Sequence, residues 1–179
     1  MRESRLGFVT EVKKNDVIIR KAEKKDYQRI LDILNMAIAG REVTALLTPV
    51  TMEGRKQWFK DHEDGIHSIY VADQDGFVLG WMAINAYRSG REGFRKACEL
   101  SYYIDSDFHS QGIGSILMAY VIDVSRQEGL KHLMLIVFAD NFKSIRLAHK
   151  FRFRIWGTFP DIVEIDGRTT DCYQLGLKL

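Results

Sequence analysis

A glycine pair between two apolar segments constrains this chain more than any other feature. Gly112 and Gly114 separate an extended, strand-like run, Leu100 to Ile104, from a helical pattern. In that pattern, apolar side chains recur every three or four residues, as on one face of a helix, at Ile113, Ile116, Leu117, Tyr120, Val121 and Val124. The glycines therefore mark a helix start, where unpaired N–H groups and the helix dipole favour an anion and glycine lets the backbone approach a phosphate. The sequence predicts an anion site that fits a pyrophosphate.

Composition narrows the classes of partner. The chain has 179 residues, 46% hydrophobic and 28% charged, which is enough for one domain with a sizeable core. Its 26 basic and 24 acidic residues leave a charge of +2, so we expect neither nucleic acid nor an acidic membrane surface as partner. No apolar stretch reaches 18 residues, and the first six residues lack the apolar region of a secretory signal.

The two cysteines bear on compartment and metal binding. Cys98 and Cys172 lie in strand-like sequence without the spacing of metal ligands. We therefore expect no metal site, no structural disulfide and a reducing compartment, with the cytoplasm as the predicted location.

The apolar patterns predict an alternation of strands and helices. A first strand at Val17–Ala22 precedes a helix after Asp26 that runs through Ile38, and a second helix begins near Thr51. The remaining predicted strands are a hairpin, residues 69–72 and 77–84, a strand that ends at Ile104, a buried strand at 133–138, and two late strands at about 153–159 and 169–177. A helix follows Asn141.

The predicted order β-α-α-β-β-β-loop-α-β-α-β-β indicates an α+β (mixed α/β) domain with a mostly antiparallel sheet in its first half. We place this domain at residues 17–179 and a loosely attached lead-in at residues 1–16. The fold class by itself names no activity.

With the glycine loop added, the chain resembles the GCN5-related N-acetyltransferase (GNAT) superfamily from Val17 onward. Three segments resemble its phosphinothricin acetyltransferase branch, namely Glu99–Ile104, Asn141–Ile145 and the ending from Asp166 to Asp171. The resemblance implies the GNAT fold, with a central, mostly antiparallel, splayed sheet flanked by helices.

The resemblance also implies acetyl-coenzyme A (acetyl-CoA) as cofactor. Its pyrophosphate would lie on N–H groups of the loop, in which His109 replaces the usual Arg or Gln, and its pantetheine arm would run beside the preceding strand as an added strand. The alternative is a plain strand-to-helix turn. Asn141 can cap its helix, contact the cofactor, or do both. The predicted cofactor-binding residues are Tyr102, Tyr103, Ile104, His109, Ser110, Gln111, Gly112, Ile113, Gly114, Ser115, Asn141 and Ser144.

Acetyl transfer to an amine needs a base, because an aliphatic ammonium is almost wholly protonated at neutral pH. Glu99 is the predicted catalytic residue: it lies among apolar residues on the strand before the loop, where the branch has its own glutamate. Partial burial would raise its pKa and allow it to accept a proton directly or through water. The alternative is a structural ion pair with Arg95 or Lys96.

The helix after Asn141 departs from the branch. Its relatives usually carry a histidine seven positions on and a Gly-Phe pair at the helix end, where this chain has Ala148 and Arg152-Phe153. His149 is one position late, which turns its side chain by about 100°, so we do not assign it to the site. Arg152 in place of glycine predicts a different helix ending. A solvated role is expected for Lys150, with an approach to the cofactor as the alternative.

The loop Tyr87–Arg95 is the predicted acceptor-binding segment. Relatives use arginine and tyrosine here, and an arginine fork can hold a carboxylate or phosphinate. We assign Arg88, Arg91 and Phe94 to it, although Phe94 stands where relatives often have tyrosine. An exposed basic loop tip is the alternative.

The predicted function is transfer of an acetyl group from acetyl-CoA to the primary amine of a small acceptor of the phosphinothricin or methionine sulfoximine type, by direct attack in a ternary complex. Two alternatives stay open: the same chemistry on a polyamine or protein amino terminus, and a non-catalytic acyl-CoA-binding sensor. Because relatives are commonly homodimers, the resemblance also implies a homodimer.

Overall fold

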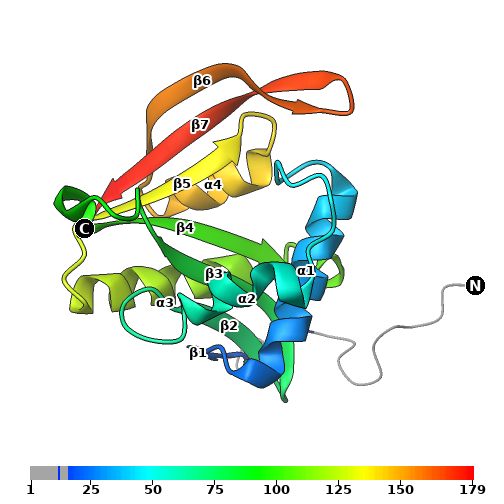
Figure 1. Cartoon of the computed structure of the whole chain (residues 1–179), viewed down its shortest axis with the longest axis vertical. Helices are drawn as coiled ribbons and strands as arrows, with labels where there is room; N and C mark the ends of the chain where they lie inside the picture. The colour runs from blue at the N-terminus through cyan, green and yellow to red at the C-terminus, as the bar shows by residue number, and fades with distance from the viewer. Residues whose placement is uncertain (1–11, 13–15) are drawn as a thin grey trace, which may run out of the picture.

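The computed structural model describes residues 12 and 16–179, which form one seven-stranded sheet in the order β1-β2-β3-β4-β5-β7-β6 (Figure 1). The strands are β1 (Ile18–Lys21), β2 (Ile69–Gln74), β3 (Phe77–Ala86), β4 (Ala97–Ile104), β5 (His132–Phe138), β6 (Arg154–Ile165) and β7 (Arg168–Lys178). The α-helices are α1 (Tyr27–Gly40), α2 (Met52–Lys60), α3 (Ile113–Gln127) and α4 (Phe142–Lys150). Short 3-10 turns cover Lys24–Asp26, Glu92–Phe94 and Ser106–Phe108.

Every strand pair in this sheet is antiparallel except β4 with β5, which is parallel. The crossover between these two strands carries α3, as a parallel connection requires. The predicted α+β class with a mostly antiparallel sheet is confirmed.

The two hairpins follow the predicted turns. Asp75 and Gly76 have φ of 55° and 83°, and Asp166 and Gly167 have φ of 51° and 77°, the pattern of a type I′ turn. Strand β6 runs six residues past the predicted end at 159, because its pairing with β7 shifts register between Phe159 and Val163. The pairing resumes at Val163 beyond this bulge, which the apolar pattern of the sequence does not show.

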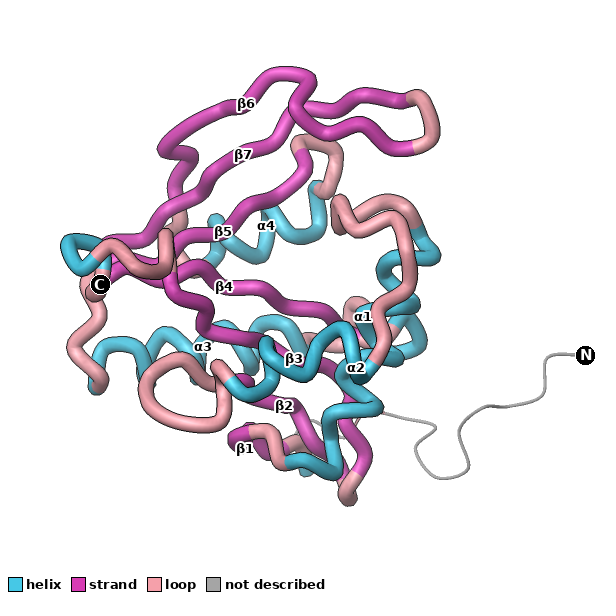
Figure 2. Tube along the Cα trace, viewed as in Figure 1, coloured by secondary structure: helices cyan, strands magenta, loops and turns pink. Residues whose placement is uncertain are grey.

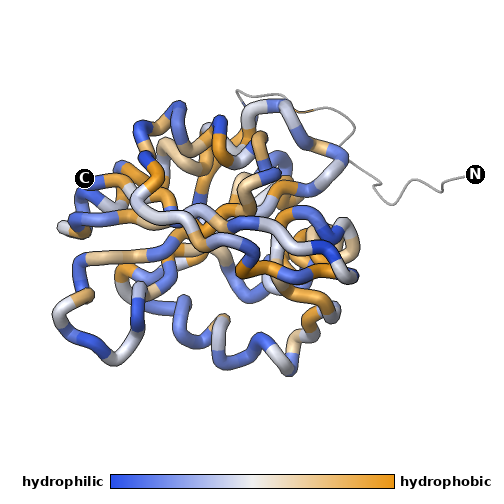
Figure 3. The backbone as a smooth tube through the Cα atoms, turned by 90° about the horizontal axis from the view of Figure 1, so that it is seen from above, coloured by the Kyte–Doolittle hydropathy of each residue, from blue (hydrophilic) through white to orange (hydrophobic). Residues whose placement is uncertain are grey.

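Helices cover both faces of the sheet (Figures 1 and 2). On one face, α1 buries Ile30, Leu34 and Ile38 against β2 and β3, and the indole N–H of Trp81 donates to the Ile30 carbonyl at 3.0 Å. On the other face, α3 and α4 pack on a second apolar cluster. Apolar segments accordingly gather between the helical layers in Figure 3.

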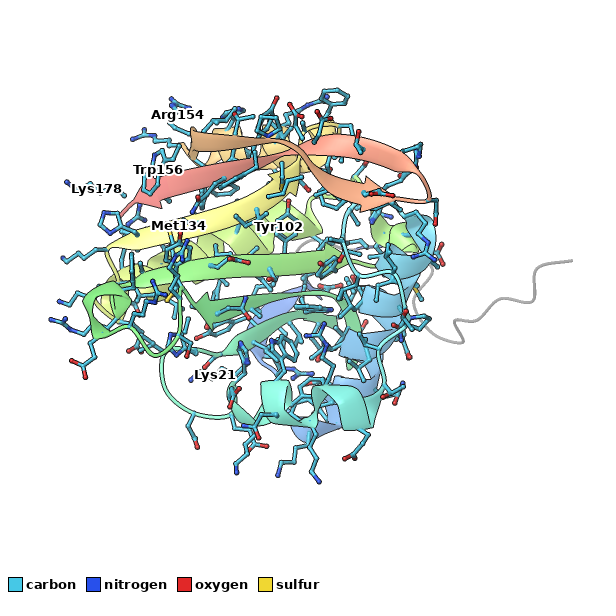
Figure 4. The ribbon with its side chains drawn as sticks, turned by 45° about the horizontal axis from the view of Figure 1, so that its top comes forward. Lys21, Tyr102, Met134, Arg154, Trp156 and Lys178 are labelled. Atoms are coloured by element: carbon cyan, nitrogen blue, oxygen red, sulfur yellow. The ribbon has the colours of Figure 1, made fainter. Side chains whose placement is uncertain are left out.

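The sheet splits between β4 and β5. The two strands pair only where Ala97–Glu99 meets His132–Met134, and beyond Glu99 they diverge. Figure 4 shows Tyr102 beyond the split and Met134 at its base. The predicted splayed sheet is thus present, and the split leaves the β5-facing edge of residues 100–104 without a strand partner in the described structure.

None of the helices in residues 12 and 16–179 is long and apolar enough to cross a membrane. Residues 1–11 and 13–15 are outside the described part, so the predicted lead-in, residues 1–16, falls mostly outside it. The domain boundary at residue 17 stays a prediction.

Candidate active site

A cleft of about 760 Å³ occupies the split between β4 and β5. Its walls come from the end of α1 and the loop after it, both diverging strands, the loop before α3, and α4. Most of the residues predicted for the site line it, namely Glu99, Tyr102, Tyr103, Ile104, His109, Ser110, Gly112, Ile113, Gly114, Ser115, Asn141 and Ser144. The fold therefore brings residues from three separate sequence segments to one cavity.

The start of α3 forms one end of this cleft. Ser110 and Gly112 both have left-handed backbones, with φ of 63° and 92°. Gly112 is the N-cap and has no side chain to cap the helix, so the N–H groups of Ile113 and Gly114 have no hydrogen-bond partner among the described residues, whereas the Ser115 N–H donates to the Gly112 carbonyl at 3.0 Å. This arrangement satisfies the physical requirement for an anion site at the loop.

The second glycine of the loop has a packing role. A Cβ on Gly114 would lie 3.1 Å from Cδ2 of Leu147, so glycine allows α3 to approach α4 closely. The two helices are also joined by a hydrogen bond of 3.1 Å from Lys150 Nζ to Ser115 Oγ. Lys150 is exposed to solvent, as expected, and it also lines the cleft.

Polar side chains tie the loop and α4 to the rest of the cleft. The Asn141 side chain accepts from the Ser144 N–H at 3.1 Å, so its predicted capping role is confirmed while it also lines the cleft. His109 Nε2 lies 2.9 Å from the Ile104 carbonyl and ties the loop back to the end of β4.

Tyr102 contributes a buried phenol to the cleft. Burial raises the pKa of this phenol, an effect that the nearby Ser144 opposes, so the group stays protonated. Its hydroxyl oxygen is buried, and although the Ser144 side chain lies near it, the two form no hydrogen bond of ordinary geometry. A buried polar atom without a partner costs about 1–3 kcal/mol, and a ligand in the cleft with a polar group there would recover that cost.

Glu99 lies at the base of the split, where it is the last β4 residue paired with β5. Its carboxyl group is half-buried, and burial raises its pKa above the ordinary value of a glutamate. The alternative ion pair with Arg95 or Lys96 is absent from residues 12 and 16–179. Glu99 therefore has the partial burial that a carboxylate base needs.

Asn85 holds the strand beside Glu99. Its amide nitrogen donates to the Glu99 carbonyl and to Ser101 Oγ, both at 3.1 Å. Its amide oxygen accepts from the indole N–H of Trp58 at 3.3 Å and lies 3.2 Å from His62 Nε2. Because an indole N–H can only donate, Trp58 fixes which way the Asn85 amide points.

Four predicted site residues are outside the cleft lining. Gln111 turns back and donates to the Asp107 carbonyl at 3.2 Å. Phe94 packs edge-on against the Tyr87 ring with centroids 5.5 Å apart, and Arg88 lies over the same ring. Arg91 is exposed in the same loop. The assignment of Arg88, Arg91 and Phe94 to the acceptor stays a prediction.

The structure adds lining residues that sequence reasoning missed. Thr44 comes from the loop after α1, Ile136 from β5, and Lys143 and Arg146 from α4. Periodicity places such residues on an element but does not tell which elements meet across the split. Ile136 is 45% exposed in a mostly buried strand, and the sequence carries no signal of that exposure.

The end of α4 corrects one expectation. Arg152 was predicted to change how the helix ends, but its N–H bonds the His149 carbonyl and the Phe153 N–H bonds the Ala148 carbonyl, both at 3.0 Å. These are the two bonds of a Schellman motif, with Arg152 at the left-handed position, φ 68°. The His149 ring lies 3.1 Å from the Phe153 carbonyl and does not line the cleft.

The sequence pattern of the acetyltransferase (GNAT) family matches residues 27–153, which include α1, both diverging strands, the glycine loop and α4. The chain belongs to the GNAT acetyltransferase family. Its fold is that of this family, and the predicted membership is confirmed.

Individual relatives are similar over most of the chain. YwnH from Bacillus subtilis, a candidate phosphinothricin acetyltransferase, is 37% identical over 90% of this chain and 98% of its own length. The L-methionine sulfoximine/L-methionine sulfone acetyltransferase of Pseudomonas aeruginosa is 32% identical over 90% of this chain and 94% of its own. The structure of yncA from Salmonella typhimurium, a candidate acetyltransferase solved with its cofactor acetyl-CoA, is 27% identical, with a TM-score of 0.86 over 92% of this chain and 95% of that one.

Proposed function

We propose that this GNAT enzyme transfers an acetyl group from acetyl-CoA to the primary amine of a small, amino-acid-like acceptor, by direct attack in a ternary complex. The observation that carries the proposal is the split between β4 and β5, which places the uncapped start of α3 and the half-buried Glu99 in one cleft.

The residues of the cleft fit acetyl-CoA. N–H groups from Ser110 to Gly114 and the side chain of Ser115 suit the pyrophosphate, and the unpaired edge of β4 suits the amide groups of the pantetheine arm. The partnerless hydroxyl of Tyr102 and the hydroxyl of Ser144 offer further polar contacts to that arm. When bound, acetyl-CoA supplies the thioester whose carbonyl carbon the acceptor amine attacks.

Glu99 is the proposed base. With its raised pKa, its carboxylate accepts a proton from the acceptor ammonium directly or through a water, which leaves the nitrogen lone pair free. The hydrogen bond from Asn85 to the Glu99 carbonyl holds the backbone at this position and so helps to set where the carboxylate lies in the cleft. Backbone N–H groups on the unpaired edge of β4 are placed to stabilise the oxyanion that forms at the thioester carbon.

The proposed acceptor class is supported by the relatives. YwnH and the Pseudomonas aeruginosa enzyme are named for phosphinothricin and for methionine sulfoximine or its sulfone, respectively. Both acceptor types carry an α-amino group and a carboxylate, and arginine suits the latter. Arg88 and Arg91 are the proposed carboxylate-binding residues, from the exposed loop that precedes β4 and Glu99.

A thiol-release screen with acetyl-CoA tests this function. Phosphinothricin, methionine sulfoximine, proteinogenic amino acids, polyamines and peptides serve as acceptors. We expect turnover with the first two or with an amino acid. Turnover restricted to polyamines or peptides would overturn the acceptor class, and binding of acetyl-CoA without turnover on any acceptor would favour the sensor.

A homodimer is part of the proposal. Apolar side chains stay exposed on β6 and at the start of α4, with 61% exposure for Ile162, 51% for Trp156 and 68% for Phe142. A second copy of the chain would cover this surface. Light scattering is expected to give twice the chain mass for the wild type, whereas a monomer would refute the dimer.

The cytoplasmic location stays a prediction; both thiols are buried and unpaired.

A further inference from the structure

A second, smaller hollow lies next to the end of the cleft that is formed by the glycine loop. We call this end, where the pyrophosphate is proposed to bind, the phosphate end. The hollow has a volume of about 250 Å³ and lies between the middle of α3 and the end of α4, with walls from Ala119, Ile122, Asp123, Arg126, Lys150, Phe151 and Arg152. Lys150 lines both this hollow and the main cleft. The two cavities are therefore neighbours that share Lys150, whose Nζ donates to Ser115 Oγ in the main cleft.

The α3 wall of the hollow continues the face that carries the phosphate loop. Ser115, Ala119, Ile122 and Arg126 follow one another at intervals of four, three and four residues, which places them on one side of the helix. At a rise of about 1.5 Å per residue, the hollow begins about 6 Å beyond Ser115. A ligand group that extends from the pyrophosphate along α3 would enter it.

The charge of the hollow is positive. Arg126, Lys150 and Arg152 line it, and Asp123 is the carboxylate among its lining residues. Asp123 accepts from Arg126 at 3.1 Å and so offsets that guanidinium. Lys150 and Arg152 form no ion pair among the described residues, which leaves both charges available to an anion.

Arg152 occupies its position at a conformational cost. It has φ of 68° at the C′ position of the Schellman motif, where glycine is favoured because it has no Cβ. Nothing in the helix ending itself requires a guanidinium. The guanidinium of Arg152 is instead available to an anion in the hollow that this residue lines.

We infer that this hollow binds the 3′-phosphate of coenzyme A through Arg152 and Lys150. The inference rests on the proposed use of acetyl-CoA, which carries a phosphate monoester on its ribose in addition to the pyrophosphate. The monoester has a charge between −1 and −2 at neutral pH and suits two unpaired cations. Arg152 thereby distinguishes coenzyme A from analogues that lack this phosphate.

Calorimetric titration with coenzyme A and with dephospho-coenzyme A tests the inference without an activity measurement. The wild type should bind coenzyme A about tenfold more tightly than the dephospho form. Arg152→Gln, which keeps the strained backbone and removes the charge, should weaken coenzyme A binding about fivefold and leave dephospho-coenzyme A unchanged.

Arg152→Gly separates a ligand role from a structural one. Relief of the left-handed strain should raise the melting temperature of the unliganded protein by about 2–4 °C, while coenzyme A binding weakens as in the Gln variant. Arg154→Gln is the matched control: this exposed arginine lies two residues on, outside the hollow, and its loss should change neither affinity.

Three results have distinct meanings. Equal affinity of the wild type for both forms, or a Gln variant that weakens both forms alike, would overturn the inference and leave the proposed acetyltransferase intact. A wild type that binds neither form would overturn the proposed function itself. Selective loss of the coenzyme A preference in both Arg152 variants supports the hollow as the 3′-phosphate site.

Discussion

The phosphate end of the cleft is made by one continuous stretch of chain, whereas the end around Glu99 is assembled from segments far apart in the sequence. Residues 109–115 supply the loop and the first turn of α3. The other end combines Thr44 from the loop after α1, Glu99 from β4 and Ile136 from β5. Backbone N–H groups serve the first end, and individual side chains serve the second.

Because of this difference, a side-chain substitution has different consequences at the two ends of the cleft. Backbone donors persist through most side-chain replacements, so we expect the loop to keep its anion-binding N–H groups whichever side chain stands at position 109. At the Glu99 end, each side chain sets the shape and polarity that the acceptor meets. Cofactor use should therefore tolerate sequence change better than acceptor choice does.

The largest expected effect is at the Glu99 end. Glu99→Gln should lower kcat/KM by about 10²–10⁴-fold and leave the dissociation constant of acetyl-CoA unchanged. Because burial raises the Glu99 pKa, wild-type kcat/KM should fall as the pH drops through a value above that of an ordinary glutamate, and the variant should lack this limb. Glu53→Gln on the exposed face of α2 is the control. Unchanged kinetics in the Glu99→Gln enzyme would reject Glu99 as the base.

The next effect is at the phosphate end. Gly112→Trp should weaken acetyl-CoA binding about 100-fold and remove its thermal stabilisation, because the left-handed N-cap is lost and the indole covers the loop. Gly129→Trp is matched, since Gly129 also has a left-handed backbone, φ 73°, but lies after α3 in open space. It should lose stability and keep the ligand-induced shift. A shift of wild-type size in the Gly112 variant would contradict the assignment of the loop.

A smaller effect is expected from the exposed loop that precedes β4. Arg88→Gln and Arg91→Gln should each raise the acceptor KM about three- to tenfold with no change in acetyl-CoA affinity, because both arginines are exposed and lie outside the lining. Arg154→Gln on β6 provides a charge-matched control, because this arginine is also exposed and outside the cleft lining. Steady-state kinetics with the acceptor found in the screen measure the KM. An altered affinity for acetyl-CoA would show that these arginines bind the cofactor and not the acceptor.

The stability of the Glu99 variant should respond to pH. Above its raised pKa, Glu99 is charged in both folded and unfolded chains, but only the folded chain bears the cost of burying that charge. Below the unfolded pKa of about 4.3, both forms are neutral and the cost vanishes. Glu99→Gln should therefore melt slightly higher than wild type at pH 7.5 and equally at pH 3.5. A lower melting temperature at pH 7.5 would show that the carboxylate stabilises the fold.

His109→Ala should have the smallest effect. It removes the contact of 2.9 Å between the ring and the Ile104 carbonyl but leaves the backbone donors of the loop, so acetyl-CoA binding should weaken only about two- to threefold. Calorimetry measures this affinity. A loss comparable to that of Gly112→Trp would mean that the side chain, and not the backbone, holds the phosphate.

The sequence predicts the phosphate end of the cleft more fully than the Glu99 end, because one continuous stretch of chain forms the phosphate end. A helix start after Gly112, a cap at Asn141 and type I′ turns at Asp75-Gly76 and Asp166-Gly167 are all local, and nearby residues determine them. The bulge that lengthens β6 depends on its pairing with β7, which local periodicity does not contain.

Which side chains line the cleft depends even more on tertiary contacts. The turn of Gln111 away from the cleft, the packing of Phe94 on Tyr87 and the place of Lys150 in the walls of two cavities follow from how separate elements meet. Arg152 shows the same limit: its identity predicted a different helix ending, but the helix keeps its Schellman motif and accepts the strain.

A crystal structure with bound acetyl-CoA and the acceptor identified in the screen tests the central claim most directly. The pyrophosphate should contact N–H groups between Ser110 and Ser115, the pantetheine arm should lie between β4 and β5, and the acceptor nitrogen should lie within direct or water-mediated reach of the Glu99 carboxylate. A cofactor bound outside this split, or an acceptor nitrogen on a side of the thioester that Glu99 does not reach, would contradict the account.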